Sequence, residues 1–218
     1  MPTMMAIEQV EQALLFDSNM FVVLGSDKTA LIDAGTGFDP DILVASIRDR
    51  LGGRPLDYLL ITHRHFDHVG GMKAVVDAFS PEVIAGETDA VPLREGDSAS
   101  TLGTDFGGRI YPTEVTGVAD GHEIDLGGHV LRVIETPGHT SGSVCFYDIS
   151  TKSLFSGDTV FVDGVGRTDL PTASHRQLVE SIGKLIEMDV VGLYPGHGPC
   201  LGDGGSAELK KALRIAGV

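Results

Sequence analysis

Short apolar runs separated by turn residues give this chain its most regular pattern. Residues 21–24 and 30–32 are such runs, and a Gly-Ser-Asp-Lys turn separates them. The segment 7–34 therefore predicts short antiparallel strands. Residues 59–61 and 81–85 are further apolar runs of strand length and predict two more strands.

Helix signals lie between these strands. The segment 39–50 begins with Asp-Pro and is followed by two glycines, and proline is favoured in the first turn of a helix. Residues 72–79 form a second predicted helix, which lies between the last two strands. A strand, a helix and a strand in this order predict parallel pairing of the two strands.

The second half of the chain repeats these element types. Strands are predicted at 130–134, 143–147, 153–159 and 190–194, and helices at 174–188 and 207–215. An α/β fold of the αββα sandwich type, with two mixed sheets flanked by helices, accommodates this order, in one domain spanning residues 1–218. Residues 90–111 are polar, Gly-rich and poorly periodic, so a lid or substrate loop and a plain surface excursion both stay open.

The charge balance narrows the possible partners. The chain carries a formal net charge of -15 and no basic cluster, so we expect no nucleic-acid partner. No apolar run approaches the roughly 18 residues of a membrane helix. The start of the chain lacks the basic and apolar parts of a secretory signal. These features predict a soluble cytoplasmic protein with no membrane partner.

The two cysteines are too few for a disulfide framework. Cys145 lies inside an apolar run and is expected to be a small core residue. Cys200 has no activating base beside it in the sequence, so we assign it no catalytic role.

One cluster of polar residues is a candidate metal site. His63, His65, Asp67 and His68 directly follow the apolar run at 59–61. His63 and His65 are two positions apart in an extended stretch, which points both side chains the same way and lets them bind one ion. Asp67 and His68 could serve a second ion if the chain turns into a helix at 69–71. A polar loop with solvated histidines is the simpler alternative, and four potential ligands in a row disfavour it.

Further potential ligands follow other predicted strands. His139, Asp158 and His197 each lie on a Gly-rich turn after an apolar strand, where a rigid sheet fixes the side chain. Asp33 also ends a strand, and we expect its carboxylate to hydrogen-bond the free ring nitrogen of a ligand histidine. The remaining histidines lack this context and are assigned surface or structural roles: His122, His129 and His175.

With these residues in this order, the chain resembles the metallo-β-lactamase fold superfamily over nearly its whole length. The resemblance implies His63, His65 and His139 on one metal ion, Asp67, His68 and His197 on a second, and Asp158 bridging the two. Zinc is the expected ion because it takes nitrogen and oxygen donors, and iron and manganese take similar ones. No ligand position departs from the family pattern.

Two divalent ions would let a bridging water lose its proton near neutral pH, because each metal lowers the pKa of that water. We expect the resulting hydroxide to attack a carbonyl carbon of a small-molecule substrate. Asp67 is the expected catalytic residue, which orients the hydroxide and then moves a proton. No Gly-x-Ser-x-Gly motif offers a serine nucleophile instead.

Residues 136–143, 155–159 and 166–171 look most like the glyoxalase II branch, whose members hydrolyse thioesters of glutathione. That branch carries a helical carboxyl-terminal region that helps to bind glutathione, whereas only 21 residues follow His197 here. Another small thioester or ester is therefore an equal expectation. Arg167 is expected to meet a substrate carboxylate, with a structural ion pair as the alternative.

Other functions stay open on the same residues. The similar persulfide dioxygenases use one iron, which would lie on His63, His139 and Asp158, and a lactonase is a further enzymatic alternative. A non-catalytic metal-binding scaffold is disfavoured, since such a protein is expected to lose a ligand and all seven positions are filled.

Overall fold

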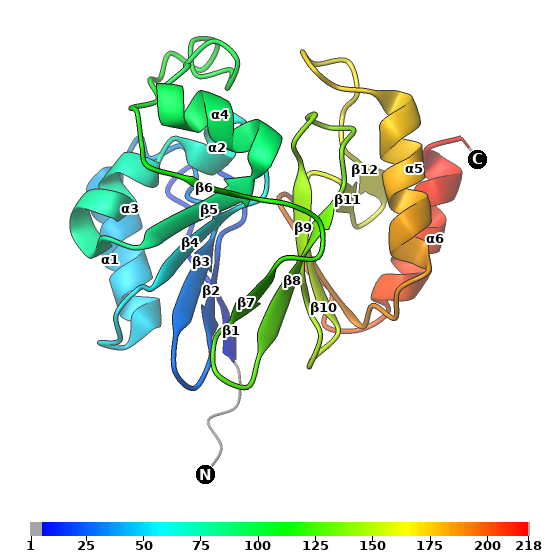
Figure 1. Ribbon diagram of the computed structural model, residues 1–218, viewed down its shortest axis with the longest axis horizontal. Coiled ribbons are helices and arrows are strands. Elements are labelled where there is room, and N and C mark those ends of the chain that lie inside the picture. Colours follow the sequence, from blue (N-terminus) through cyan, green and yellow to red (C-terminus); the bar gives the residue numbers. More distant parts are fainter. Residues whose placement is uncertain (1–5, 218) are drawn as a thin grey trace.

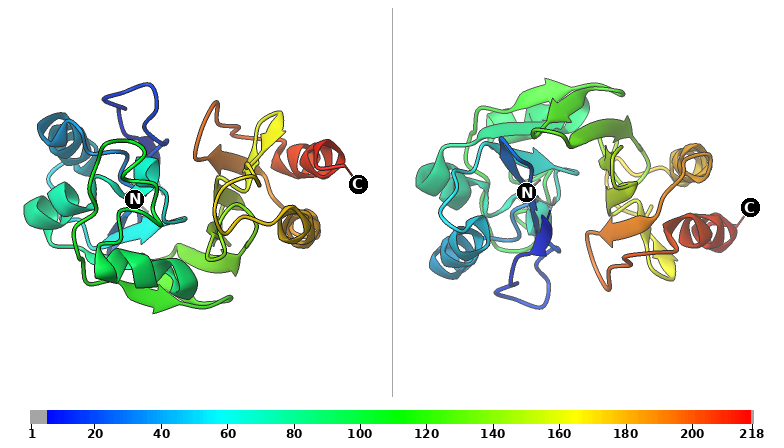
Figure 2. Two further views of the ribbon diagram at one scale, coloured as in Figure 1. Left: turned by 90° about the horizontal axis from the view of Figure 1, so that it is seen from above. Right: turned by 90° about the horizontal axis from the view of Figure 1, so that it is seen from below.

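A computed structural model describes residues 6–217. Residues 1–5, which entered the prediction of no secretory signal, and residue 218 lie outside the described residues. Two β-sheets pack face to face, and helices cover the outer side of each (Figure 1; Figure 2). The predicted αββα sandwich of two mixed sheets is confirmed.

The first sheet contains the amino-terminal half of the chain. Its strands lie in chain order: β1 (Ala6–Gln9), β2 (Phe21–Leu24), β3 (Thr29–Ile32), β4 (Tyr58–Ile61), β5 (Glu82–Gly86) and β6 (Thr116–Val118). The first three are antiparallel, and β3 to β6 are parallel. The helices on this side are α1 (Pro40–Leu51), α2 (Phe66–Val69), α3 (Met72–Phe79) and α4 (Glu87–Glu95).

Local signals define α1 at both ends. The side chain of Asp39 accepts a hydrogen bond from the backbone N–H of Ile42, which caps the first turn. Gly52 follows the helix in the left-handed conformation, with a φ of 58°, and ends it. The helix that the Asp-Pro pair predicted is thus confirmed.

The second sheet contains five strands in the order β13-β10-β9-β8-β7. These are β7 (Glu123–Asp125), β8 (Val130–Glu135), β9 (Val144–Asp148), β10 (Ser153–Gly157) and β13 (Gly192–Pro195). Only the pair of β10 and β13 is parallel. Helices α5 (His175–Ile186) and α6 (Gly205–Ile215) cover its outer face, and β11 (Val160–Phe161) and β12 (Gly164–Val165) form a separate small hairpin.

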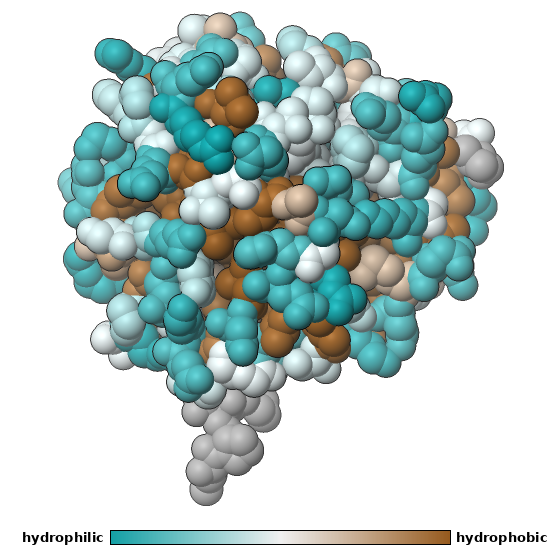
Figure 3. All heavy atoms as spheres, in the orientation of Figure 1, coloured by the Kyte–Doolittle hydropathy of each residue, from teal (hydrophilic) through white to brown (hydrophobic). Residues whose placement is uncertain are grey.

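The hydrophobic core has three layers, as this architecture requires. Phe21, Leu60, Val133, Phe146 and Phe155 are among the residues buried between the two sheets. A second cluster fills the space between the first sheet and its helices, and a third lies between the second sheet and α5 and α6. On the face drawn in Figure 3, hydrophilic side chains predominate, and apolar ones show between them around β6, β7 and β8.

Residues 90–111 differ from the predicted irregular segment in their first part. Residues 90–95 belong to α4, a helix that contains Pro92 and has no side-chain cap at its start. Packing overrides these weak local signals, because Ala90 and Leu93 are fully buried against the first sheet's outer core. Only the segment after α4 is irregular. Within residues 6–217, no helix is both long and apolar enough to cross a membrane.

Candidate metal centre

Strand ends bring the predicted ligands together. β4 ends at Ile61, just before His63, and β10 ends at Gly157, just before Asp158. Gly157 pairs with Pro195 of the parallel strand β13, so the turns that follow both strands lie at one edge of the sheet. The helix α2 begins at Phe66, earlier than the predicted turn at 69–71, and carries Asp67 and His68.

All seven predicted ligand residues lie in one place. They form three overlapping groups whose ligand atoms lie within 4.8 Å of one another: His63 with His65 and His139, His63 with His68 and Asp158, and Asp67 with His68 and His197. None of these groups contains His122, His129 or His175. The residues that are far apart in the chain therefore share a single site.

The first group consists of three imidazoles. His65 Nδ1 lies 2.8 Å from His139 Nε2. The ring of His63 lies with its centroid 4.8 Å from the centroids of both other rings. Three nitrogen donors at this spacing match the donor set of a zinc or iron site.

Asp67, His68 and His197 form the second group, and Asp158 joins it to the first. His197 Nε2 lies 2.9 Å from Asp67 Oδ2, and His68 Nε2 lies 3.7 Å from the same oxygen. Asp158 Oδ2 lies 3.6 Å from His139 Nε2 and 3.7 Å from His197 Nε2. One carboxylate thus faces a ligand of each group.

Several buried polar atoms at this point have no hydrogen-bond partner among residues 6–217. They include His63 Nε2, His68 Nε2 and Asp158 Oδ1. The last two are 3.2 Å apart but do not meet in hydrogen-bond geometry. Buried polar atoms are normally paired, so a cluster of such atoms on imidazole and carboxylate groups fits a divalent metal site.

Burial sets the protonation of the first group. It lowers the pKa of His63 well below the ordinary value of 6.5, with a further contribution from His68. Burial also lowers the pKa of His65 to about 3. Both rings are therefore neutral at physiological pH and keep the lone pair that a metal ligand needs.

The second group carries an excess of negative charge. Burial alone would lower the pKa of His68, but Asp33, Asp158 and Asp67 together raise it well above 6.5. Burial likewise opposes ionisation of Asp158, and His68 nevertheless lowers the pKa of this carboxyl. A cation would offset these clustered carboxylates.

Asp33 orients the ring of His68 through its Nδ1 atom. Its Oδ2 lies 2.8 Å from His68 Nδ1, and both carboxylate oxygens accept hydrogen bonds from Thr62. This contact leaves His68 Nε2 directed at the site. On the other side, His139 Nδ1 lies 2.9 Å from the backbone oxygen of Arg167, which fixes that ring as well.

A buried ion pair next to the ligands was not found from the sequence. Arg64 Nε lies 3.4 Å from Asp89 Oδ1, and Asp89 Oδ2 accepts hydrogen bonds from the Arg64 backbone N–H at 2.9 Å and from Thr140 at 2.7 Å. The guanidinium also donates to Ser141 and Thr172. Arg64 therefore ties the loop of His63 and His65 to the loop of His139. Asp89 lies in α4, which the sequence did not predict, so no local signal pointed to it.

Asn19 was also missed. Its backbone N–H donates to Gly196 at 2.6 Å, and its side-chain amide donates to the backbone oxygens of Pro195 and Gly198. These bonds fix the turn that carries His197. The sequence holds no signal for them, because Asn19 is remote from this turn along the chain.

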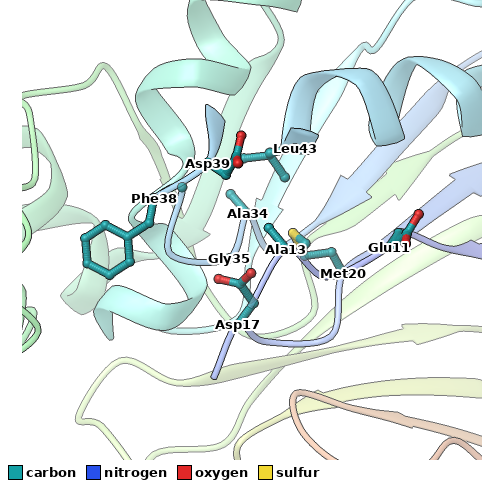
Figure 4. Close-up of a pocket in the computed structure, with 10 residues that line it drawn as sticks. Glu11, Ala13, Asp17, Met20, Ala34, Gly35, Phe38, Asp39 and Leu43 are labelled. Atoms are coloured by element: carbon teal, nitrogen blue, oxygen red, sulfur yellow. The ribbon is translucent and has the colours of Figure 1, made fainter. Parts of the chain in front are cut away.

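The loop before Asn19 is anchored in the same region. Asp17 accepts hydrogen bonds from the backbone and hydroxyl of Thr36 and points toward Gly35 (Figure 4). Asp17 and Gly35 also line a small cavity with a volume of about 10 Å³. It is effectively filled and offers no ligand site.

A larger cavity of about 310 Å³ opens over the ligand groups. It is lined by His65, Asp67, His139, Asp158 and His197, and by Leu102, Phe106, Phe161, Arg167 and Leu170. The guanidinium of Arg167 already makes two hydrogen bonds to Asp169, at 2.9 and 2.8 Å. Arg167 thus lines the cavity, where a substrate could meet it. Its guanidinium forms an ion pair with Asp169, which was the alternative to substrate binding.

The chain is similar to one protein family and to several individual proteins. A family model for the metallo-beta-lactamase superfamily matches residues 14–197. A probable metallo-hydrolase of Methanocaldococcus jannaschii is 36% identical over 187 residues, which cover 84% of this chain and 88% of that protein. An acyl-coenzyme A thioesterase of Bos taurus is 34% identical over 206 residues, covering 83% of this chain and 72% of that protein.

A hydroxyacylglutathione hydrolase of Francisella philomiragia is 32% identical over 187 residues, which cover 85% of this chain but only 62% of that longer protein. Among solved structures, the protein TTHA1623 in a di-iron-bound form has a TM-score of 0.75 at 30% identity. That similarity covers 93% of this chain and 95% of the other.

Proposed function

This chain belongs to the metallo-beta-lactamase superfamily, and we propose that it is a metal-dependent hydrolase of a small thioester or ester. One observation carries the proposal. Seven histidine and aspartate side chains form one cluster, five of them line the cavity above it, and buried ring nitrogens in the cluster lack a partner among residues 6–217.

The donor set supports two divalent ions, with zinc as the expected metal and iron or manganese as alternatives. His63, His65 and His139 would hold one ion, Asp67, His68 and His197 the other, and Asp158 would be shared. When bound, such ions lower the pKa of water and polarise a carbonyl oxygen.

Asp67 is suited to move the proton. Burial opposes its ionisation, but His68 and a hydrogen bond from His197 lower the pKa of its carboxyl. Asp67 is therefore an ionised acceptor at neutral pH. Its contact with His197 fixes the carboxylate at the cavity wall, within reach of a substrate.

The proposal that the substrate is a thioester is based on the similar proteins. Two of them are named for hydrolysis of a glutathione thioester and of acyl-coenzyme A. The bond cleaved is the same in both, and the thiol that carries the acyl group differs. Because this chain spans 62% of the hydroxyacylglutathione hydrolase, its thiol carrier does not follow from that relative.

Metal content and hydrolysis test the proposal together. Protein purified without added metal should contain two divalent ions per chain and cleave acyl thioesters under anaerobic conditions. The double variant His63→Ala/His65→Ala should lose metal and turnover, whereas His122→Ala, at an exposed histidine outside the site, should lose neither. Hydrolysis retained in the double variant would refute the proposal. A content of one iron per chain, together with oxygen consumption when a persulfide is supplied, would favour the persulfide dioxygenase alternative over the hydrolase.

A further inference from the structure

Four phenylalanines meet in a closed ring of contacts beside the metal centre. The centroid of Phe38 lies 6.4 Å from that of Phe16 and 5.4 Å from that of Phe66, and the centroid of Phe106 lies 5.7 Å from that of Phe66 and 6.4 Å from that of Phe16. They come from four separate segments of the chain. We call this cluster the phenylalanine quartet.

The quartet is largely exposed. Phe16, Phe38 and Phe106 are 49%, 45% and 39% exposed, and only Phe66 is buried. Leu15, next to Phe16, is fully exposed. Single apolar side chains are common on protein surfaces, but aromatic rings in mutual contact form a patch, and such patches mark binding sites.

Phe38 belongs to this surface and not to the core of its own loop. Figure 4 shows its ring pointing away from Met20 and Leu43, which pack on the inner side of the loop. Its ring contacts lie instead with Phe16 and Phe66.

The quartet is continuous with the metal cavity. Phe106 lines that cavity together with His65 and Asp67. Phe66 lies between these two ligands in the sequence, and its ring packs on Phe106. A group bound over the ligands therefore reaches the quartet directly at Phe106.

A second cavity begins on the other side of the quartet. It has a volume of about 360 Å³, and its wall contains Phe38, Phe66 and Tyr111. Gly108 of the irregular segment after α4 also lines this cavity and packs closely on Phe66, since a Cβ there would lie 2.0 Å from Phe66 Cζ. Both cavities are within the size range of small-molecule sites.

Most charged side chains along this path contact other side chains. In the second cavity, Lys73 forms an ion pair with Asp77, and the guanidinium of Arg109 lies 5.3 Å from the centroid of the Tyr111 ring. At the metal cavity, Arg167 is paired with Asp169. The other metal-cavity walls away from the ligands are apolar: Leu102, Phe106, Phe161 and Leu170. An uncharged hydrocarbon group matches these surfaces better than a carboxylate does.

We propose that the quartet and the two cavities bind an apolar acyl chain of the substrate, so that the hydrolase acts on thioesters or esters of hydrocarbon acids. This inference rests on the proposed function. The reacting carbonyl lies over the ligand groups, and the chain runs across Phe106 toward Phe38 and the second cavity.

Binding without catalysis tests this site independently of the reaction. Butanol, hexanol and octanol are titrated by calorimetry into protein treated with a chelator. Each added methylene should tighten binding, by at most about fourfold, which is the value for complete burial. Phe38→Ala and Phe106→Ala should flatten this dependence, whereas Ile149→Ala, at an exposed apolar residue beyond the far end of β9, should leave it unchanged. Octanol that binds no tighter than butanol would overturn the inference.

Turnover gives the second measurement. The value of kcat/KM should rise from butanoyl to octanoyl thioesters of N-acetylcysteamine. Phe106→Ala should remove most of this rise by increasing KM for the longer substrates. Cleavage that is independent of chain length would refute the inference and leave the proposed function standing. Length-dependent alcohol binding without cleavage of either thioesters or esters would refute the proposed function and leave only an apolar binding site. If sedimentation shows a dimer that Phe38→Ala dissociates, the quartet is an interface with a second copy, and the inference is wrong.

Discussion

Replacing Asp89 by alanine should destabilise the fold and weaken metal binding together. Asp89 is 1% exposed and faces the nearly buried guanidinium of Arg64. The substitution leaves that guanidinium without its carboxylate. It also removes the acceptor of the Arg64 backbone N–H and of the Thr140 hydroxyl, which join the loops on either side of the metal centre.

The expected cost follows from these contacts. Removing one partner of a buried ion pair costs about 3–5 kcal/mol, because the other charge stays buried and unpaired. The variant Asp89→Asn keeps one acceptor oxygen for the Arg64 backbone N–H and the Thr140 hydroxyl, although it replaces the other oxygen by a donor and removes the charge, so it should cost less than Asp89→Ala. Because the two residues are in contact, the double variant Arg64→Ala/Asp89→Ala should cost less than the sum of the single variants.

Urea unfolding of chelator-treated protein measures this cost, and metal content after dialysis measures the effect on the site. Asp169→Ala is the matched control, because it also removes the carboxylate of an arginine ion pair, but one that is fully exposed. The control should leave the free energy of unfolding nearly unchanged. If Asp89→Ala costs less than about 1 kcal/mol, or if its effect adds to that of Arg64→Ala, the buried pair does not hold these loops.

Three further outcomes are expected. Gly196→Ala should weaken metal retention measured by dialysis, since its Cβ would lie 2.3 Å from Asp158 Oδ1, whereas Gly202→Ala, with open space around it, should not. Burial raises the pKa of the Cys145 and Cys200 thiols to about 11, so Ellman's reagent should label neither near neutral pH until urea is added; rapid native labelling would contradict this. Chelated protein should lose stability as the pH falls from 6.5 toward 3, because His65 has a folded-state pKa of about 3 and the unfolded chain takes up the proton. The contribution is about 1.4 kcal/mol per pH unit, and the slope of unfolding free energy against pH should decrease in His65→Gln.

The sequence predicted those elements whose local pattern and tertiary packing agree. Residues 72–79 are the predicted helix without change, and residues 21–24 are the predicted strand. The short strands β6 and β7 were not predicted. Another exception is α4, where Pro92 and an uncapped start gave no helix signal. Its fully buried residues Ala90 and Leu93 depend on contacts with distant segments, which no local pattern contains.

The same distinction applies to the site. Ligands such as His139 and Asp158 could be predicted because each lies on a turn that follows a strand, and strand ends meet at a sheet edge. Arg64 gave no such signal, although it lies between two predicted ligands, because its partner Asp89 is distant along the chain. Asn19 acts on backbone oxygens, which every residue has, so only the folded structure identifies what it holds.

The alternation of residues at the start of α2 would link the proposed metal site to the proposed acyl site. His65 and Asp67 line the metal cavity, whereas Phe66 between them packs with Phe38 and Phe106 and lines the second cavity. One short segment thus presents ligands on one side and an apolar ring on the other. Because Phe66 is buried and lies between His65 and Asp67 in the chain, Phe66→Ala should alter metal affinity together with the proposed acyl selectivity. Phe38 is half exposed and is not adjacent to a predicted ligand, so Phe38→Ala should alter the proposed selectivity and leave metal content unchanged.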